Sequence, residues 1–116
     1  MSIRIERIGE QVRGELSRLL RDEVSDPRIG MLSLTRVEVA PDLSTAAVFW
    51  SPLGPKAEDV EQMAEGLMSA AGFLRRRLAK ELSLRRTPEL RFRHDPSLEL
   101  GAETLALLRE LEVADG

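Results

Sequence analysis

The clearest pattern in the chain is an apolar stripe with helical spacing near the amino terminus. Between residues 5 and 24, apolar residues recur every three or four positions, which predicts one buried face of an amphipathic helix. The opposite face is polar, and its charges are all positive. The helix is expected to end before the segment Ser-Asp-Pro-Arg-Ile-Gly, because proline disfavours helical geometry in the residue before it. The apolar stripe consists of Ile5, Ile8, Val12, Leu16, Leu19, Leu20 and Val24.

The next two segments alternate apolar and polar residues, which is typical of β-strands that pack on a core by one face. In residues 32–39 the alternation slips by one position, so a β-bulge near Thr35–Arg36 is needed to keep the apolar side chains on the core side. In the second segment, Ala46, Val48 and Trp50 share one face. The sequence Ala-Pro-Asp-Leu-Ser between the segments favours a turn, and the two segments therefore predict an antiparallel hairpin.

A helical period returns over residues 57–82, a segment long enough for about seven turns. Such a helix is long for a domain of this size, and Gly72 lies in its middle, where glycine costs about 1 kcal/mol relative to alanine. We expect a kink or break within two residues of Gly72, which would divide the segment into two helices of ordinary length. The apolar stripe of this segment is Val60, Met63, Leu67, Ala71, Leu74 and Leu78.

The end of the chain predicts one more strand and one more helix. Residues 89–93 alternate, with Leu90 and Phe92 directed toward the core, and residues 97–111 form a helix with a weaker apolar pattern that Ser97 caps. The order helix, strand, strand, helix, helix, strand and terminal helix predicts an α+β two-layer sandwich with the helices on one face of the sheet.

The length of the chain suits one domain with one hydrophobic core. We therefore treat residues 1–116 as a single domain, with its core at about residues 5–95 followed by the terminal helix. The central contacts of this core are expected to involve Leu16, Leu19, Val48 and Phe92.

Positive charge is concentrated in one part of an otherwise acidic chain. The net charge is −3, from 17 basic and 20 acidic residues, but residues 73–93 carry eight basic and two acidic residues. In the stretch Ser69–Arg86, six basic residues follow the small-residue step Ala-Ala-Gly. Such a molecule can dock one face on phosphates while the rest of its surface stays acidic. The alternative is a solvated helix face, which is the usual meaning of a charge run.

Few residues of this chain are suited to catalysis. It has no cysteine, and its single histidine, His94, lies beside Asp95 at the end of the last predicted strand. The sequence contains no nucleophile elbow, phosphate-binding loop, dinucleotide fingerprint or zinc-protease motif. We interpret His94 as a strand-end or surface residue and expect no enzymatic activity, cofactor or metal. The lack of cysteine fits a reducing cytoplasm, and the charged amino terminus fits neither a signal peptide nor a membrane span.

Three motifs occur together along the chain: Asp-Pro-Arg-x-Gly after the first helix, Ala-x-Gly-Phe followed by basic residues, and Pro-Glu-Leu-x-Phe in the last strand. In this combination the chain resembles the bacterial ribosome-binding factor A family, over about residues 5–111. The resemblance implies a type II KH-like fold, in which an interhelical Ala-x-Gly kink replaces the usual Gly-x-x-Gly loop. Ala70, Ala71 and Gly72 match that kink. In KH domains the loop clamps the backbone of single-stranded nucleic acid.

The resemblance also implies a function. Members of the family bind the small (30S) ribosomal subunit, assist late processing at the 5′ end of its 16S rRNA and support growth in the cold, without known catalytic activity. They act together with assembly GTPases. For this chain the resemblance predicts a monomeric, cytoplasmic assembly factor with no cofactor and no membrane association. A protein-interaction module, whose acidic and arginine surfaces pair with another protein, is the alternative from a different class.

The predicted binding surface joins the small residues to the basic residues that follow them. The small residues would let the rRNA backbone approach closely, and the arginines would neutralise phosphates without reading the base sequence. The positive stripe of the first helix, Arg4, Arg7, Arg18 and Arg21, is a second candidate surface, for which simple solvation is the alternative. Phe49, on the sheet face away from the helices, either stacks on a base or serves packing. The main candidate residues are Ala70, Ala71, Gly72, Arg75, Arg76, Arg77, Lys80, Arg85 and Arg86.

Overall fold

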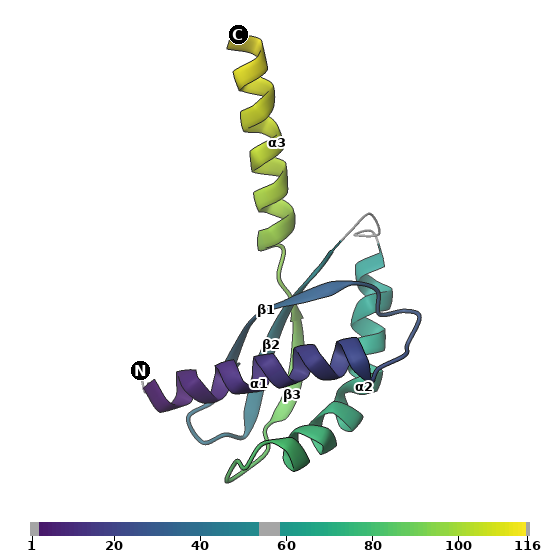
Figure 1. Cartoon of the computed structure of the whole chain (residues 1–116), viewed down its shortest axis with the longest axis vertical. Helices are drawn as coiled ribbons and strands as arrows, with labels where there is room; N and C mark the ends of the chain where they lie inside the picture. Colours follow the sequence, from purple (N-terminus) through teal and green to yellow (C-terminus); the bar gives the residue numbers. More distant parts are fainter. Residues whose placement is uncertain (1–2, 54–58, 116) are drawn as a thin grey trace.

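A three-stranded β-sheet forms one layer of the structure, and two helices form a second layer on one of its faces (Figure 1). The computed structural model describes residues 3–53 and 59–115. A third helix, α3, extends away from both layers (Figure 1). This is the α+β two-layer arrangement that the sequence predicts. The elements are α1 (Ile3–Asp22), β1 (Leu32–Val39), β2 (Thr45–Pro52), α2 (Val60–Glu81), β3 (Glu89–His94) and α3 (Ser97–Asp115).

The strands lie in the order β1-β2-β3, so the hairpin supplies one edge and the centre of the sheet. β1 and β2 are antiparallel, and β3 lies parallel to β2 on its other side. The predicted bulge is confirmed, because the register shifts between Leu34 and Arg36 and leaves Thr35 without a partner in the ladder. As a result, Leu34 before the bulge and Val39 after it are both buried.

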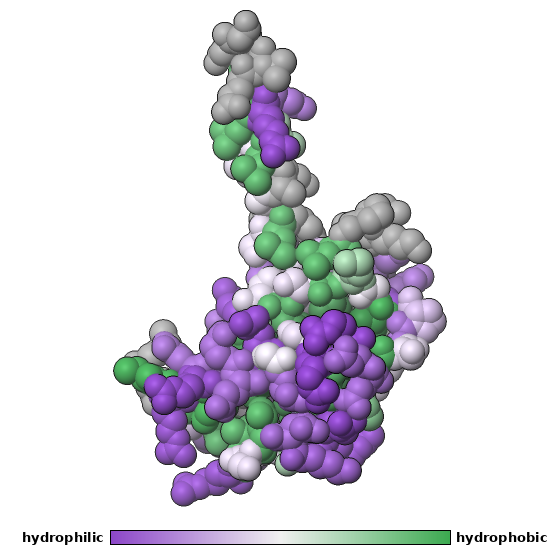
Figure 2. All heavy atoms as spheres, viewed as in Figure 1, coloured by the Kyte–Doolittle hydropathy of each residue, from purple (hydrophilic) through white to green (hydrophobic). Residues whose placement is uncertain are grey.

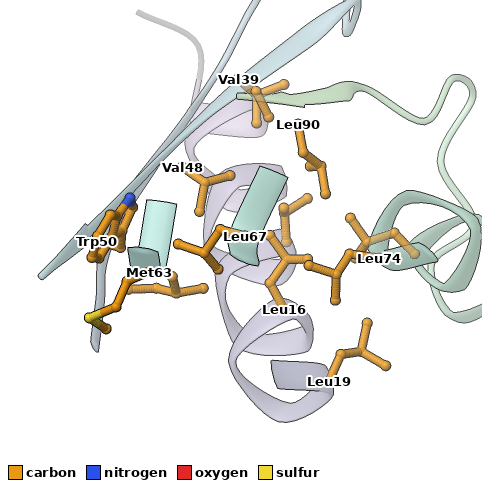
Figure 3. Close-up of a cluster of buried hydrophobic side chains, with 13 residues drawn as sticks. Leu16, Leu19, Val39, Val48, Trp50, Met63, Leu67, Leu74 and Leu90 are labelled. Atoms are coloured by element: carbon orange, nitrogen blue, oxygen red, sulfur yellow. The ribbon is translucent and has the colours of Figure 1, made fainter. Parts of the chain in front are cut away.

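Apolar side chains of α1 and α2 fill the space beneath the sheet (Figure 3). Leu16, Leu19 and Val48 have no exposed surface, and Phe92 is partly buried against the same cluster. The residues expected at the centre of the core are thus confirmed as members of one cluster. The other buried apolar residues of this cluster are Val12, Leu34, Val39, Ala46, Trp50, Met63, Leu67, Leu74, Leu78 and Leu90.

The expected division of residues 57–82 into two helices is wrong. Val60–Glu81 form a single α-helix that continues through Gly72, although its ribbon changes direction partway along (Figure 1). Gly72 does not have a left-handed backbone angle. The predicted break is therefore wrong, whereas a bend of the helix, which is the other form of the prediction, is visible in its ribbon. The structure has one helix where the resemblance implied a pair; residues 57–58 of the predicted segment lie outside the described residues.

A different glycine of α2 is required for close packing. A Cβ added at Gly66 would lie 2.6 Å from Ile29 Cγ1 and 3.3 Å from Arg28 Cβ. Here α2 approaches the segment between α1 and β1 more closely than a larger residue would allow. Gly9 has the corresponding role in α1, because a Cβ there would lie 2.7 Å from the carbonyl oxygen of Val37.

Asp95 connects the end of the sheet to the start of α3. Its carboxylate accepts hydrogen bonds from Thr35 Oγ1 at 2.6 Å and from the backbone N–H of Ser97 at 2.9 Å. Its backbone N–H donates to the carbonyl oxygen of Trp50 at 2.6 Å. The expectation that Ser97 is the N-cap is wrong, because Ser97 is already the first residue of α3, and its backbone N–H binds the carboxylate of Asp95. Beyond this junction α3 leaves a set of leucines exposed: Leu98, Leu105, Leu107, Leu108 and Leu111.

Candidate nucleic-acid interface

Hydrophilic side chains gather over α1 and over the C-terminal half of α2 (Figure 2). In this half of α2, Arg75 is exposed and donates two hydrogen bonds to the carbonyl oxygen of Thr87, from Nη2 at 3.0 Å and from Nε at 3.3 Å. These bonds hold α2 against the segment that leads into β3. Because the acceptor is a neutral carbonyl, the guanidinium of Arg75 keeps its net charge for an anionic partner.

The small residues predicted to receive an RNA backbone lie beside a guanidinium. Gly72 is exposed, whereas Ala70 and Ala71 are half-buried. A Cβ added at Gly72 would lie 3.5 Å from Arg76 Nη1, which is an ordinary van der Waals distance. The side chain of Arg76 thus reaches back along α2 toward the surface that glycine leaves open. A phosphate that approached here would meet a shallow surface and a positive charge together.

Arg77 has a different environment from Arg75 and Arg76. Its guanidinium pairs with Glu23, just after α1, and with Glu81 at 3.3 Å, and its side chain is only 27% exposed. Arg18 joins this cluster through Glu15 and through longer contacts to Glu23 (3.9 Å) and Glu81 (4.0 Å).

The carboxylates of this cluster hold both arginines in their charged form. Hydrogen bonding to Glu23 and then to Glu81 raises the pKa of Arg77, and hydrogen bonding to Glu15 raises the pKa of Arg18. Two guanidinium groups and three carboxylates therefore connect α1 to α2, and the carboxylates compensate both positive charges. We call these five residues the interhelical charge cluster. The geometry gives Arg18 and Arg77 a structural role that the sequence pattern did not reveal.

The loop after α2 meets the start of α1 at a hollow in the surface, which we call the basic hollow. Arg85 and Arg86 line it together with Arg4, which lies about 80 residues earlier in the chain. The structure therefore brings residues of the main candidate group and of the second candidate group to one place. The hollow is completed by Ile5, Ile8, Pro41, Asp42 and Leu43.

The turn between β1 and β2 forms one wall of the basic hollow. Leu43 has a φ of 62°, in the left-handed region that leucine seldom adopts, and its N–H donates to the carbonyl oxygen of Ala40 at 2.8 Å. Packing of Leu43 against the core offsets this strain. Asp42 accepts hydrogen bonds from Oγ and N–H of Ser44 at 2.6 and 3.0 Å. These bonds, with a smaller contribution from the charge of Arg86, lower the pKa of Asp42.

The remaining candidate residues lie around these regions. Arg7 and Lys80 are exposed, and Arg21 is exposed but pairs with Asp22 at 3.1 Å. Apart from Arg75, which binds the carbonyl oxygen of Thr87, several of the candidate residues have no carboxylate within 4.0 Å among residues 3–53 and 59–115, and we call these candidates the unpaired basic residues. They are Arg4, Arg7, Arg76, Lys80, Arg85 and Arg86.

Phe49 lies half-buried on the sheet face away from α1 and α2, and the guanidinium carbon of Arg36 lies 4.0 Å from its ring centroid. Sequence reasoning placed Phe49 on this face but did not single out Arg36. The signal was available in the predicted bulge, because the shift by one residue pairs Arg36 with Phe49 in the register.

His94 is the last residue of β3 and is exposed, as predicted for a strand-end residue, and its ring centroid lies 5.3 Å from that of Trp50. Within the part of the chain that the structure describes, no three histidine, cysteine, aspartate or glutamate residues are grouped so that they could hold a metal ion. The helices formed by the described residues are too short or too polar to cross a membrane.

Known proteins resemble this chain over most of its length. The family described as "Ribosome-binding factor A" matches residues 4–108. Ribosome-binding factor A of Dechloromonas aromatica (strain RCB) is 49% identical over 105 residues, which cover 90% of this chain and 83% of that protein. Ribosome-binding factor A of Pseudomonas syringae pv. syringae (strain B728a) is 42% identical over 114 residues, which cover 97% of this chain and 83% of that protein.

Solved structures have the same fold. The solution NMR structure of a Thermotoga maritima protein has a TM-score of 0.69 at 32% identity and covers 80% of this chain and 88% of its own. A homology model of Thermus thermophilus ribosome-binding factor A, fitted into the cryo-EM map of a 30S–RbfA complex, has a TM-score of 0.65 at 23% identity and covers 79% of this chain and 96% of its own. The resemblance found in the motifs is therefore confirmed along the whole core, and the chain belongs to the ribosome-binding factor A family.

Proposed function

We propose that this protein binds the small ribosomal subunit and assists its late maturation, including processing at the 5′ end of 16S rRNA, without catalysing a reaction itself. Family membership supports this proposal, as does the structural neighbour that was fitted into a map of a 30S complex. The observation that carries it is the convergence of Arg4, Arg85 and Arg86 on the basic hollow. The proposed setting is the cytoplasm, with the protein acting as a monomer beside assembly GTPases and supporting growth in the cold.

The unpaired basic residues suit a folded rRNA surface. Arginine and lysine side chains that meet phosphates release condensed counterions, which supplies affinity without sequence preference. The basic hollow and the surface at Ala70–Gly72 present such side chains. At Ala70–Gly72 the neighbouring side chains are small, so the RNA backbone can come close to the protein. Specificity would then come from the shape of the rRNA and of the subunit, because phosphate contacts position a protein without reading bases.

Binding to purified immature 30S subunits tests the proposal. We expect Arg85→Ala combined with Arg86→Ala to weaken binding at low salt and to reduce the salt slope of log K by roughly 1.4–1.8, because each lost phosphate contact removes 0.7–0.9. The matched control is Arg13→Ala combined with Arg109→Ala, which removes the same charge from α1 and α3. If both double variants lose the same affinity for the subunit, net charge alone explains the loss, and the proposed surface is contradicted.

Location in the cell provides an independent test. In a sucrose gradient of cell extract, the protein should migrate with free small subunits. Cells that lack it should accumulate 16S rRNA with an unprocessed 5′ end, most strongly in the cold. Normal rRNA processing and growth in the cold without the protein would contradict the maturation role.

Binding to another protein is the second candidate function, and an apolar hollow on the opposite side of α1 favours it. A hydrophobic area lies near the base of α3 (Figure 2), and both Met31 and Leu53 at this hollow are exposed. Its other apolar lining residues are Leu20, Val24, Ile29, Leu32 and Leu34. An assembly GTPase would be captured by the wild type but not by Met31→Asp if this surface receives a protein.

A further inference from the structure

The sheet has one face that neither α1 nor α2 covers. On β2, the residues directed to the helices, Ala46, Val48 and Trp50, are at most 1% exposed, whereas the alternate residues from Thr45 to Phe49 are only partly buried. The neighbouring strands present charged side chains on this open face. These are Arg36 and Glu38 from β1, and Glu89, Arg91 and Arg93 from β3, all of them exposed.

Phe49 lies at the centre of this face between two arginines. The register pairs it with Arg36 on β1 and with Arg93 on β3, so both arginines are its direct cross-strand neighbours. Arg36 places its guanidinium carbon 4.0 Å from the Phe49 ring centroid, well within the range of a cation–π contact. The Nε of Arg36 also lies 3.2 Å from Oε1 of Glu38, which holds the guanidinium over the ring.

The other charges of the open face leave Arg93 available. Arg91 lies 3.9 Å from Glu89. Hydrogen bonds with Thr35 and Ser97 lower the pKa of Asp95, and the charge of Arg36 contributes to this lowering to a smaller extent. Arg93 has no carboxylate within 4.0 Å in the described ranges. A positive charge without a partner therefore lies next to the Phe49–Arg36 stack.

We infer that this open face is a second RNA contact, at which one unpaired nucleobase stacks on the Arg36 guanidinium over Phe49 while Arg93 meets the adjoining phosphate. Proteins hold unstacked bases on aromatic rings and on arginine planes, and every base has a face that fits them. The occupant is a single-stranded nucleotide rather than a protein surface, because the apolar surface of this face is confined to Phe49 and Ala47. This site is separate from the basic hollow. It rests on the proposed function in one respect, which is that the bound RNA is the rRNA of the small subunit.

The probe that tests the inference is a fluorescent single-stranded oligoadenylate of about eight nucleotides, within the usual range of site sizes. It is titrated into the full-length protein and followed by fluorescence anisotropy. Phe49→Leu keeps an apolar side chain but removes the ring, and Arg36→Lys keeps the charge but removes the planar group. We expect Phe49→Leu to weaken binding about 5- to 150-fold, the range of alanine substitutions at stacked bases. Arg36→Lys should also weaken binding of the oligoadenylate.

Arg91→Ala is the matched control, because Arg91 lies on the same strand and face but pairs in register with Ala47 rather than with Phe49. It should bind the oligomer nearly as wild type does, whereas Arg93→Ala should bind more weakly and with a smaller salt slope. An abasic oligomer of the same length should bind wild type and Phe49→Leu equally, because it offers phosphates but no base.

The inference is overturned if Phe49→Leu and Arg36→Lys both bind the oligomer as wild type does, or if the abasic oligomer binds wild type as tightly as oligoadenylate. Displacement of the oligomer by polyglutamate at equal charge concentration would also overturn it, in favour of an acidic protein. Since Arg36→Lys leaves the core unchanged, it decides the question even if Phe49→Leu is unfolded. Loss of 30S binding by the basic-hollow variant, with no effect of these variants on the oligomer, would reject the sheet site alone.

Discussion

The two glycines of α2 provide a test of how closely this helix packs. Alanine is a better helix former than glycine, by about 0.8–1.0 kcal/mol at an interior position. Gly66 and Gly72 both lie inside the single helix Val60–Glu81, so the substitutions Gly66→Ala and Gly72→Ala gain the same intrinsic term. They differ in what the new methyl group meets.

At Gly72 the new Cβ would lie 3.5 Å from Arg76 Nη1, the end of a flexible side chain. We therefore expect Gly72→Ala to raise the free energy of unfolding by about 1 kcal/mol, which is roughly 4 °C in Tm for a domain of this size. At Gly66 the Cβ would lie 2.6 Å from Ile29 Cγ1 and 3.3 Å from Arg28 Cβ. Such overpacking costs about 1–3 kcal/mol, so Gly66→Ala should be neutral to destabilising by up to about 2 kcal/mol.

The two variants should thus differ by about 1–3 kcal/mol, because their propensity terms cancel and only the packing term of Gly66 remains. Urea denaturation followed by far-UV circular dichroism measures this difference with little dependence on the absolute values. If Gly66→Ala is as stable as Gly72→Ala, the close approach of α2 to residues 28–29 is refuted. If Gly72→Ala is destabilising, the continuous helix through that position is refuted.

The same pair of variants separates stability from binding at the candidate interface. A methyl group at residue 72 occupies the open surface beside Arg76. If an RNA backbone lies there, Gly72→Ala should bind immature 30S subunits more weakly while it is the more stable protein. Gly72→Val should weaken binding further, because its larger side chain fills more of that surface. Unchanged binding in both variants would keep the helix and remove this surface from the interface.

Three further predictions concern the core, the interhelical charge cluster and the junction with α3. Leu16→Ala should lower the free energy of unfolding by about 2–5 kcal/mol in urea titrations, because it leaves a cavity at the centre of the core; a loss below 1 kcal/mol would contradict its complete burial. Arg77→Ala should lower Tm, and the loss should shrink at high salt as the ion pairs are screened, whereas Arg76→Ala should leave Tm unchanged; equal shifts would contradict the assignment. For Asp95, hydrogen bonds lower the native pKa, so its contribution to stability is present above the ordinary aspartate pKa and is lost as the pH falls through the lowered native pKa. The difference in stability between wild type and Asp95→Asn should accordingly be large at neutral pH and vanish in strong acid, and a difference that does not vary with pH would refute the role of the charge.

The amino-acid sequence by itself determined the family and most of the secondary structure, apart from the continuity of α2. Burial imposes a period of about 3.6 on a helix and of 2 on a strand, so the stripes of α1 and α2 and the alternation of the hairpin are readable without coordinates. The bulge was readable for the same reason, because a slipped phase has to be repaired if Leu34 and Val39 are both to face the core.

Only the tertiary structure decided which basic residues pair with carboxylates and which face solvent. Three successive arginines point to three sides of a helix, and the sequence around them contains no sign that Arg77 faces Glu23, just after α1, while Arg76 faces solvent. Nor does any local pattern reveal that Arg4 lies beside Arg85 and Arg86. A sequence pattern records whether a side chain is buried, but its partner across space depends on how the elements pack.

The two glycines of α2 illustrate the same limit. Glycine in a helix signals either a bend or a close approach, and the sequence offers no way to choose between them at a given position. The pattern at Gly72 predicts a break or a bend; α2 continues through it as one helix whose ribbon changes direction, while Gly66 is the position that a neighbouring segment closely approaches. Residues 28–29 lie far away along the chain, so the contact that makes Gly66 necessary exists only once α2 has packed against them.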